Sequence, residues 1–194
     1  MCLLITTPAG VTIEDEWLRD FYLRNDDGYG FMYAHENKLH VFKRLGTVEQ
    51  FISDWRSFEC YDRAIHLRMR THGDIDLVNC HPYWVTGFNN DDELPLAMMH
   101  NGVLSSGNSA DTSKSDTWHY INDTLTPLLA KYPDLLQETA FQQLVEEHIG
   151  AHNRFVFLDS LGRMVTLNYG EGVTWEGMWF SNTYAWSQIG RAHV

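Results

Sequence analysis

Cys2 is the residue whose type and position most directly suggest chemistry in this chain. Removal of Met1 would leave a thiol nucleophile and a free α-amine on the same residue. An adjacent amine can act as the base that activates such a nucleophile. The small side chain of Cys2 also suits the aminopeptidase that removes initiator methionine. The alternative is an ordinary cysteine that happens to lie early, and the segments downstream decide between the two.

A thiolate that attacks an amide needs preorganised hydrogen-bond donors for the oxyanion that forms. Asn101-Gly102 offers two, the side-chain amide of Asn101 and the backbone N–H of Gly102. The pair follows an apolar segment, Leu96 to His100, that predicts a strand. Asn-Gly is also a strong signal for a hairpin turn, so the dipeptide by itself leaves both interpretations open.

Two charged residues could bind the carboxylate and the ammonium of a free amino acid. Arg68 lies in a segment of alternating apolar residues, a costly place for a cation unless an anion accompanies it. Asp116 begins a predicted helix within Ser115-Asp-Thr117. An aspartate there can stabilise the helix start, bind an ammonium, or do both. Arg68 could instead form a structural ion pair or lie on a solvated face.

Four residues have the donor types of a zinc site, namely His72, Cys80, His81 and His100. Their spacing matches no common zinc pattern, and the adjacent Cys80 and His81 would converge poorly on one ion. The Gly-rich turn Asp27-Gly-Tyr-Gly30 is no phosphate loop, because no Lys-Ser/Thr follows it. We therefore expect neither a metal nor another cofactor.

The composition is that of a globular protein, with 194 residues, 44% hydrophobic and 21% charged. It predicts a single domain over residues 1–194. A formal net charge of −12 argues against nucleic-acid or acidic-membrane binding as the main activity. Three cysteines without a framework spacing indicate reduced thiols and a cytoplasmic setting. The first residues lack the features of a signal peptide, and no stretch is long enough to span a membrane.

Predicted strands cluster at both ends of the chain, with a pair of helices between them. Capping boxes at Thr12 and Thr47 predict the starts of two early helices. The remaining predicted elements are strands over 3–6, 29–34, 39–42, 63–70, 96–100, 155–158, 164–167 and 179–180, helices over 116–131 and 134–148, and a long loop over 71–93. This order indicates an α+β fold with largely antiparallel sheets.

Six segments, a Met-Cys start and five more in order after it, resemble the class II glutamine amidotransferases of the N-terminal-nucleophile hydrolase superfamily. Each is a weak motif alone, but together they span about the first two-thirds of the chain. The segments are Met1-Cys2, Asp27-Gly-Tyr-Gly30, His66-Leu-Arg-Met-Arg-Thr-His-Gly73, Asn79-Cys-His-Pro82, His100-Asn-Gly102 and Ser115-Asp-Thr117.

This resemblance implies a four-layer αββα sandwich with two mainly antiparallel sheets. It implies hydrolysis of the side-chain amide of L-glutamine to glutamate and ammonia, through a thioester on Cys2 with its own α-amine as base. The catalytic residues would be Cys2, with Asn101 and Gly102 as the oxyanion hole.

The resemblance likewise assigns the glutamine α-carboxylate to Arg68, with help from Thr71 and His72. It assigns the α-ammonium to Asp116. His81 and Tyr29 would lie around the pocket with less defined roles.

Three departures from the family pattern affect these expectations. Arg70 stands where the family has a small residue, and strand alternation puts it on the face of Arg68, where it would either add a charge near the pocket or bend outward as the strand ends. Leu3 replaces a common glycine. The chain has the size of a glutaminase domain alone, so the ammonia would either be released or pass to a separate synthase.

Two other functions are compatible with the same residues. One is a different N-terminal-nucleophile amidase or peptidase, which would not need both Arg68 and Asp116. The other is an inactive glutamine-binding module, which a retained Met1 would favour. The aromatic segment Trp175 to Trp186 indicates core packing, with a docking surface for a synthase as the alternative.

Overall fold

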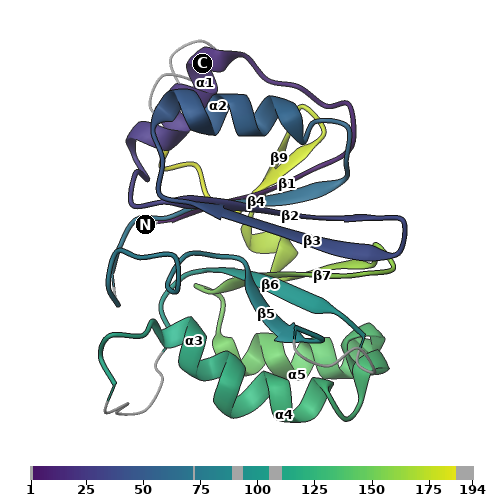
Figure 1. The fold of residues 1–194 in the computed structure, drawn as a ribbon. Helices are drawn as coiled ribbons and strands as arrows, with labels where there is room; N and C mark the ends of the chain where they lie inside the picture. Colours follow the sequence, from purple (N-terminus) through teal and green to yellow (C-terminus); the bar gives the residue numbers. More distant parts are fainter. Residues whose placement is uncertain (1, 72, 89–93, 105–110, 187–194) are drawn as a thin grey trace.

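Two β-sheets pack face to face, and helices cover the outer face of each sheet (Figure 1). The computed structural model describes residues 2–71, 73–88, 94–104 and 111–186. Every strand pair in both sheets is antiparallel. The predicted α+β class and four-layer αββα sandwich are therefore confirmed.

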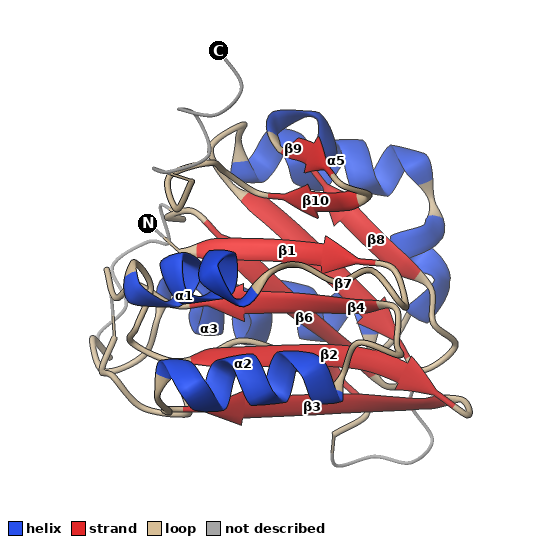
Figure 2. Cartoon of the chain, turned by 90° about the horizontal axis from the view of Figure 1, so that it is seen from above, coloured by secondary structure: helices blue, strands red, loops and turns tan. Residues whose placement is uncertain are grey.

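The larger sheet has six strands in the order β3-β2-β4-β1-β10-β9. Helices α1 (Asp15–Leu23) and α2 (Val48–Ser57) lie across its outer face (Figure 2). Its strands are β1 (Leu3–Thr7), β2 (Tyr29–His35), β3 (Lys38–Arg44), β4 (Arg63–Leu67), β9 (Val173–Trp175) and β10 (Met178–Phe180).

The smaller sheet has four strands in the order β5-β6-β7-β8, and the later helices cover its outer face (Figure 1). Its strands are β5 (Tyr83–Thr86), β6 (Leu96–Asn101), β7 (Arg154–Asp159) and β8 (Met164–Leu167). The helical elements are α3 (Asp116–Tyr120), the π-helical η1 (Ile121–Leu125), α4 (Thr126–Leu129), the 3₁₀ turn η2 (Pro133–Gln137), α5 (Thr139–Ile149) and the 3₁₀ turn η3 (Tyr169–Glu171).

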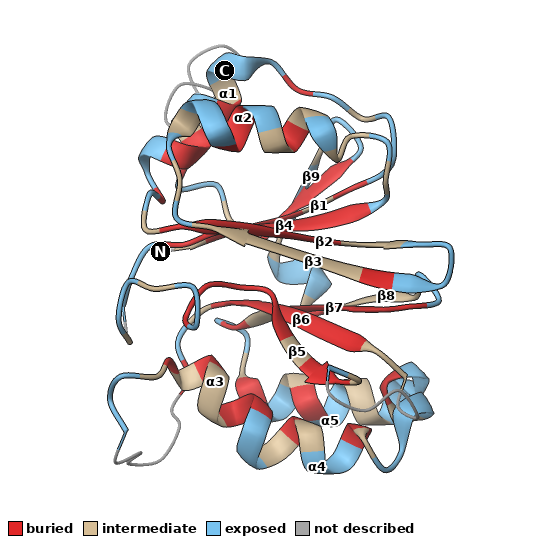
Figure 3. Cartoon of the chain, viewed as in Figure 1, coloured by how far each residue is buried: buried red, intermediate tan, exposed pale blue. Residues whose placement is uncertain are grey.

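Three apolar layers hold the sandwich together. One lies under α1 and α2, one under α3 to α5, and one between the sheets, where Leu4, Met32 and Val156 meet. Because both faces of β4 are covered, all five of its residues are buried (Figure 3). The alternation seen in the sequence of this strand therefore separates two buried faces, not a core face from solvent.

The two predicted capping boxes have different outcomes. At α2 the Thr47 hydroxyl accepts the Gln50 N–H and the Gln50 side chain accepts the Thr47 N–H, as predicted. The prediction at Thr12 is wrong, because α1 begins at Asp15 with Glu14 at its N-cap. The Thr12 hydroxyl instead donates to the Glu59 carboxylate at 2.7 Å. A tertiary contact has replaced the local one.

Four predicted element boundaries also need correction. Strand β4 ends at Leu67, short of the predicted 70. The predicted loop 71–93 contains β5, which pairs with β6. The predicted helix 134–148 is split, since Glu138 has an extended backbone between η2 and α5. The helix from Asp116 is confirmed at its start but contains the π-helical turn η1 and reaches only Leu129.

The segments that carry the motifs meet at one end of the sandwich. There β1, β2 and β5 begin, and β4, β6 and β10 end, as the antiparallel registers require. The N-terminus marks this end in Figure 2. Among the described residues, no helix has the length and apolar character needed to cross a membrane.

Candidate active site

Cys2 immediately precedes β1 and is partly buried. Leu4 belongs to the layer between the sheets, so Cys2, two positions earlier, faces the same side. The Cys2 thiol donates to the Met69 carbonyl at 3.3 Å, and the Met69 N–H lies 3.4 Å from the same sulfur. The backbone beyond β4 therefore holds the sulfur in place.

Burial raises the pKa of the Cys2 thiol above its ordinary value. The hydrogen bond with the Met69 backbone and the positive charge of Arg68 oppose this rise but do not cancel it. A thiol in this environment is largely protonated near neutral pH, so it needs a base to become a nucleophile. A free α-amine on Cys2 could act as that base.

Asn101 is the last residue of β6 and is 1% exposed. Its side-chain amide donates a 2.7 Å hydrogen bond to the Ser181 hydroxyl oxygen. The same oxygen accepts the N–H of Leu4 at 3.0 Å. Ser181 thus joins the end of β6 to β1, the strand that begins beside Cys2.

Gly102 follows with a φ of +146°, a backbone conformation that residues other than glycine rarely adopt. A Cβ at this position would also lie 2.8 Å from the carbonyl oxygen of His152. The chain does not turn back here, because β7 pairs with β6 only after α3, α4 and α5. The hairpin interpretation of Asn101-Gly102 is therefore wrong.

Asn182 is part of this network, although none of the sequence motifs includes it. Its side-chain amide donates to the backbone carbonyl of Cys2 at 2.8 Å and to the Ser181 hydroxyl at 3.3 Å. Its Oδ1 accepts the N–H of Tyr184 at 3.1 Å. The polar pair Ser181-Asn182 inside an aromatic segment is the one feature of the sequence that could have indicated this role.

The aromatic residues around that pair pack into the core, as predicted. Trp175 stacks on Trp17 with a 4.8 Å separation of ring centroids. Trp186 meets Phe180 edge to face at 5.0 Å. Tyr184 differs, since it is 67% exposed.

Arg68 directly follows β4 and is 4% exposed. Its backbone N–H donates to the Gly28 carbonyl at 2.8 Å, and its carbonyl accepts the Asp27 N–H at 3.1 Å. One guanidinium nitrogen donates to the Asp74 carbonyl at 2.8 Å. The Asp-Gly-Tyr-Gly turn therefore positions this arginine by pairing with its backbone.

The two glycines of that turn allow the Asn79-Cys-His-Pro82 motif to approach closely. A Cβ on Gly28 would collide with the Leu45 side chain at 2.8 Å and with the Cys80 sulfur at 2.6 Å. A Cβ on Gly30 would lie 2.9 Å from Cδ of Pro82. The turn and the Asn-Cys-His-Pro segment are packed as one unit.

Asp116 is the first residue of α3, and Ser115 caps this helix by accepting the Trp118 N–H. One carboxylate oxygen of Asp116 accepts the Leu104 N–H at 2.7 Å, and the other accepts the Thr117 N–H at 2.8 Å. Asp116 thus supports the start of α3 and ties it to the segment that follows Gly102. The partly exposed carboxylate retains capacity for an ammonium group.

The other predicted binding residues have mixed outcomes. Thr71 is exposed in the loop after Arg68, and His72 lies outside the described residues. Arg70 does not share the face of Arg68, because β4 has already ended and the side chain is exposed. The expectation for Tyr29 is wrong, since its hydroxyl donates to Asp54 at 2.7 Å on the helix-covered face of the sheet.

His81 is 6% exposed and lies behind the candidate site among other histidines. Its ring centroid is 4.1 Å from that of His66, and neither of its ring nitrogens has a hydrogen-bond partner among the described residues. His66 bonds the His100 carbonyl at 3.0 Å. Burial lowers the pKa of all three histidines, to about 3 for His66, so the cluster is neutral.

His100 connects two parts of the candidate site through its ring. One nitrogen lies 2.7 Å from the Thr117 hydroxyl and the other 2.9 Å from Oδ1 of Asn153. Within the described part of the chain, no group of three or more His, Cys, Asp or Glu side chains is arranged to bind a metal. The zinc alternative therefore gains no support there, and His72 lies outside that part.

No family model matches the chain. A curated relative, glutamine–fructose-6-phosphate aminotransferase (isomerizing) of Helicobacter pylori, is 27% identical over 128 residues. The match includes 64% of this chain and 20% of the relative, so the chain spans about one fifth of that protein.

Two solved structures share the fold. Glutamine phosphoribosylpyrophosphate amidotransferase from B. subtilis, complexed with ADP and GMP, aligns with a TM-score of 0.52 at 16% identity, covering 98% of this chain and 44% of that one. An allosteric regulatory enzyme of purine biosynthesis aligns with a TM-score of 0.50 at 16% identity, covering 98% and 43%. The chain is therefore similar in sequence, over 64% of its length, to an aminotransferase that uses glutamine, and it shares the fold of two solved structures, one of them a glutamine amidotransferase.

Proposed function

We propose that this chain hydrolyses the side-chain amide of L-glutamine to glutamate and ammonia, with Cys2 as the nucleophile. One observation carries the proposal. The Ser181-Asn182 pair bonds the Cys2 carbonyl, the β1 backbone and the Asn101 side chain, which supports a common site for Cys2 and Asn101. The similarity to glutamine amidotransferases supports the choice of glutamine.

In the first half-reaction the Cys2 sulfur forms a bond to the amide carbon of glutamine. The proton of the thiol passes to the α-amine of Cys2, which must be free of Met1 for this role. Asn101 and the Gly102 N–H stabilise the oxyanion, and its collapse breaks the carbon–nitrogen bond as the amine returns the proton to the departing ammonia. Water then attacks the thioester, which releases glutamate and restores the thiol.

Substrate binding would use the two charged residues beside this centre. The Arg68 guanidinium, buried and oriented by the Asp74 carbonyl, is suited to the planar α-carboxylate. The Asp116 carboxylate, oriented by two backbone N–H groups, is suited to the α-ammonium. Thr71 and His72 would complete the carboxylate site. The requirement for both charges favours free glutamine over a peptide.

The fate of the ammonia is a separate matter. The chain spans about one fifth of its curated relative, so it corresponds to one portion of that larger enzyme. We propose that residues 1–194 form one glutaminase domain, whose ammonia is either released or passed to a synthase.

Intact mass spectrometry of the native protein, before and after a glutamine-analogue electrophile, tests the proposed chemistry. We expect loss of Met1, one adduct on the native protein and none on Cys2→Ala, with glutaminase turnover lost in parallel. Cys60→Ala is the matched control, because Cys60 is an exposed thiol outside the site. Unchanged turnover in Cys2→Ala contradicts the proposal, and hydrolysis of α-blocked glutamine amides as fast as free glutamine indicates a different amidase.

A further inference from the structure

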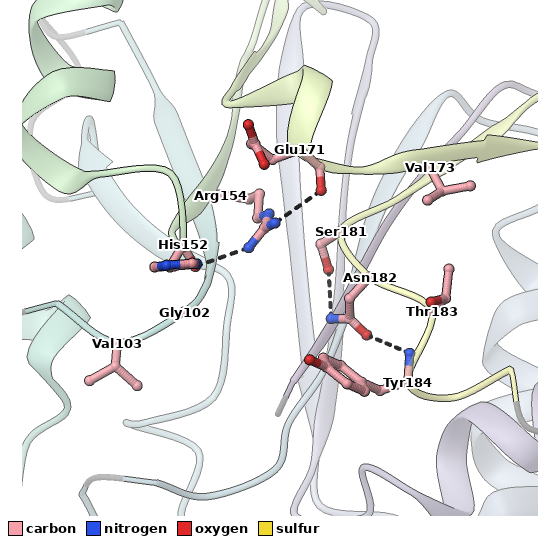
Figure 4. A pocket seen from close by; sticks show the side chains of 10 residues that line it. All are labelled: Gly102, Val103, His152, Arg154, Glu171, Val173, Ser181, Asn182, Thr183 and Tyr184. Carbon is pink, nitrogen blue, oxygen red and sulfur yellow. Dashed lines mark hydrogen bonds between the residues drawn. The ribbon is translucent and has the colours of Figure 1, made fainter.

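A hollow adjoins the candidate oxyanion hole and has no part in the proposed binding of glutamine. Its volume is about 450 Å³, and its walls come from residues 102 and 103, 152 and 154, 171 and 173, and 181–184 (Figure 4). Neither Arg68 nor Asp116 lines it. The volume is within the range of small-molecule sites.

The hollow shares three residues with the surroundings of the nucleophile. Gly102 follows Asn101, Ser181 accepts the Asn101 amide, and Asn182 donates to the Cys2 carbonyl. A molecule in the hollow would therefore contact residues that hydrogen-bond to Cys2 and Asn101, although Cys2 itself does not line the hollow.

Among the described residues that line this hollow, Arg154 is the one arginine or lysine and Glu171 the one acidic residue. Its guanidinium donates to the His152 carbonyl at 3.0 Å and to the Glu171 carbonyl at 2.9 Å (Figure 4). Both acceptors are neutral backbone groups, and in the described part of the chain Arg154 forms no ion pair with a carboxylate. Its Nε is buried and has no hydrogen-bond partner there.

These contacts orient the guanidinium without neutralising its charge. A planar, oriented cation whose two terminal nitrogens each keep a second N–H recognises a carboxylate or a phosphate, which accept two parallel hydrogen bonds. Asn182 and Tyr184 line the opposite side of the hollow (Figure 4). The exposed Tyr184 and Val173 offer apolar contact to the body of a ligand.

We propose that this hollow binds a small molecule that carries a carboxylate or phosphate group, with the anion on Arg154 and the rest of the molecule against Val173 and Tyr184. The proposal concerns binding alone and does not depend on turnover by Cys2. It is therefore tested on Cys2→Ala, in which a failure of the glutaminase proposal has no effect on the result.

Isothermal titration calorimetry of Cys2→Ala with inorganic phosphate and, separately, succinate at constant ionic strength is the test. We expect saturable binding of at least one probe, and the stronger probe assigns the anion as phosphate or carboxylate. Addition of Arg154→Gln should weaken that binding by about tenfold or more. Lys38→Gln, the same charge change at an exposed position at the start of β3, should leave it unchanged.

A second variant keeps the test decisive if Arg154→Gln does not fold. Thr183→Glu places a negative charge in the hollow at an exposed position and leaves both Arg154 hydrogen bonds in place. It should weaken binding of the same probe as well. Absence of saturable binding to Cys2→Ala, or equal binding in whichever of these variants folds, overturns the proposal.

Discussion

The side-chain amide of Asn182 donates a 2.8 Å hydrogen bond to the backbone carbonyl of Cys2, although 180 positions separate the two residues. The segment after β10 thereby orients the residue that we propose as the nucleophile. Asn182 makes no proposed contact with glutamine, so we regard it as a positioning residue.

Asn182→Ala should lower kcat for glutamine hydrolysis by about tenfold or more while KM changes little, because it misplaces Cys2 and leaves Arg68 and Asp116 intact. Steady-state kinetics measure both constants. Asn122→Ala is the control, since Asn122 is exposed and its amide caps only the Trp118 carbonyl. A rise in KM with unchanged kcat would show that Asn182 acts on substrate binding instead.

Asn101→Ala removes a proposed oxyanion donor and should lower kcat by about 10²–10³-fold. The loss should appear in kcat and kcat/KM alike, because the donor acts on the transition state more than on bound glutamine. Urea unfolding of the variant reports any separate loss of stability from the broken bond to Ser181. A kcat within twofold of the parent enzyme would exclude Asn101 from the oxyanion hole.

Asp116→Asn should raise KM for glutamine by about tenfold or more, since an amide lacks the charge that pairs with the α-ammonium. The amide oxygen can still accept one of the two backbone N–H groups, so the helix start should persist. Asp123→Asn makes the same change at an exposed position of η1 and should leave KM unaltered. Equal KM values for the two variants would argue that Asp116 is purely structural.

The buried histidines predict loss of stability in acid. Burial lowers the pKa of His66 to about 3, whereas the unfolded chain takes up this proton near pH 6.5. The unfolded state therefore binds more protons as pH falls below 6.5, and at pH 5 His66 alone reduces the free energy of unfolding by about 2 kcal/mol. Urea unfolding at pH 7.5 and pH 5 measures the difference.

Substitution separates His66 from other acid-sensitive groups. His66→Gln should reduce the difference between the two pH values, and His35→Gln, at an exposed position, should not. A difference that is the same in both variants would assign the acid sensitivity to other groups.

Gly30→Ala should lower the free energy of unfolding by about 2 kcal/mol or more, because its Cβ would collide with the backbone carbonyls of Phe42 and His81 and with the Pro82 ring. Gly170→Ala is the matched control, since a Cβ there meets nothing within 4 Å. Thermal or urea unfolding compares the two. Equal stabilities would mean that the turn shifts to make room at little cost.

The chain's own order of residues determined its fold class and its candidate chemistry. Strand and helix periodicity depend on local spacing, so the hairpin of β2 and β3, the start of α2 and the strand before Asn101 could all be predicted. Cys2, Arg68 and Asp116 could likewise be selected as candidate site residues, because residue type and flanking sequence are enough to indicate them.

Only the tertiary structure decided which side chains meet. The Thr12 hydroxyl bonds to Glu59 and does not cap a helix, and the Tyr29 hydroxyl bonds to Asp54 and does not face the candidate site. In both cases a contact between distant segments determines the position of the side chain. Asn182 reaches Cys2 only because β10 pairs with β1 in the six-stranded sheet. Sequence periodicity tells which face of a strand a side chain occupies, but the pairing of strands far apart in the chain determines what that face contacts.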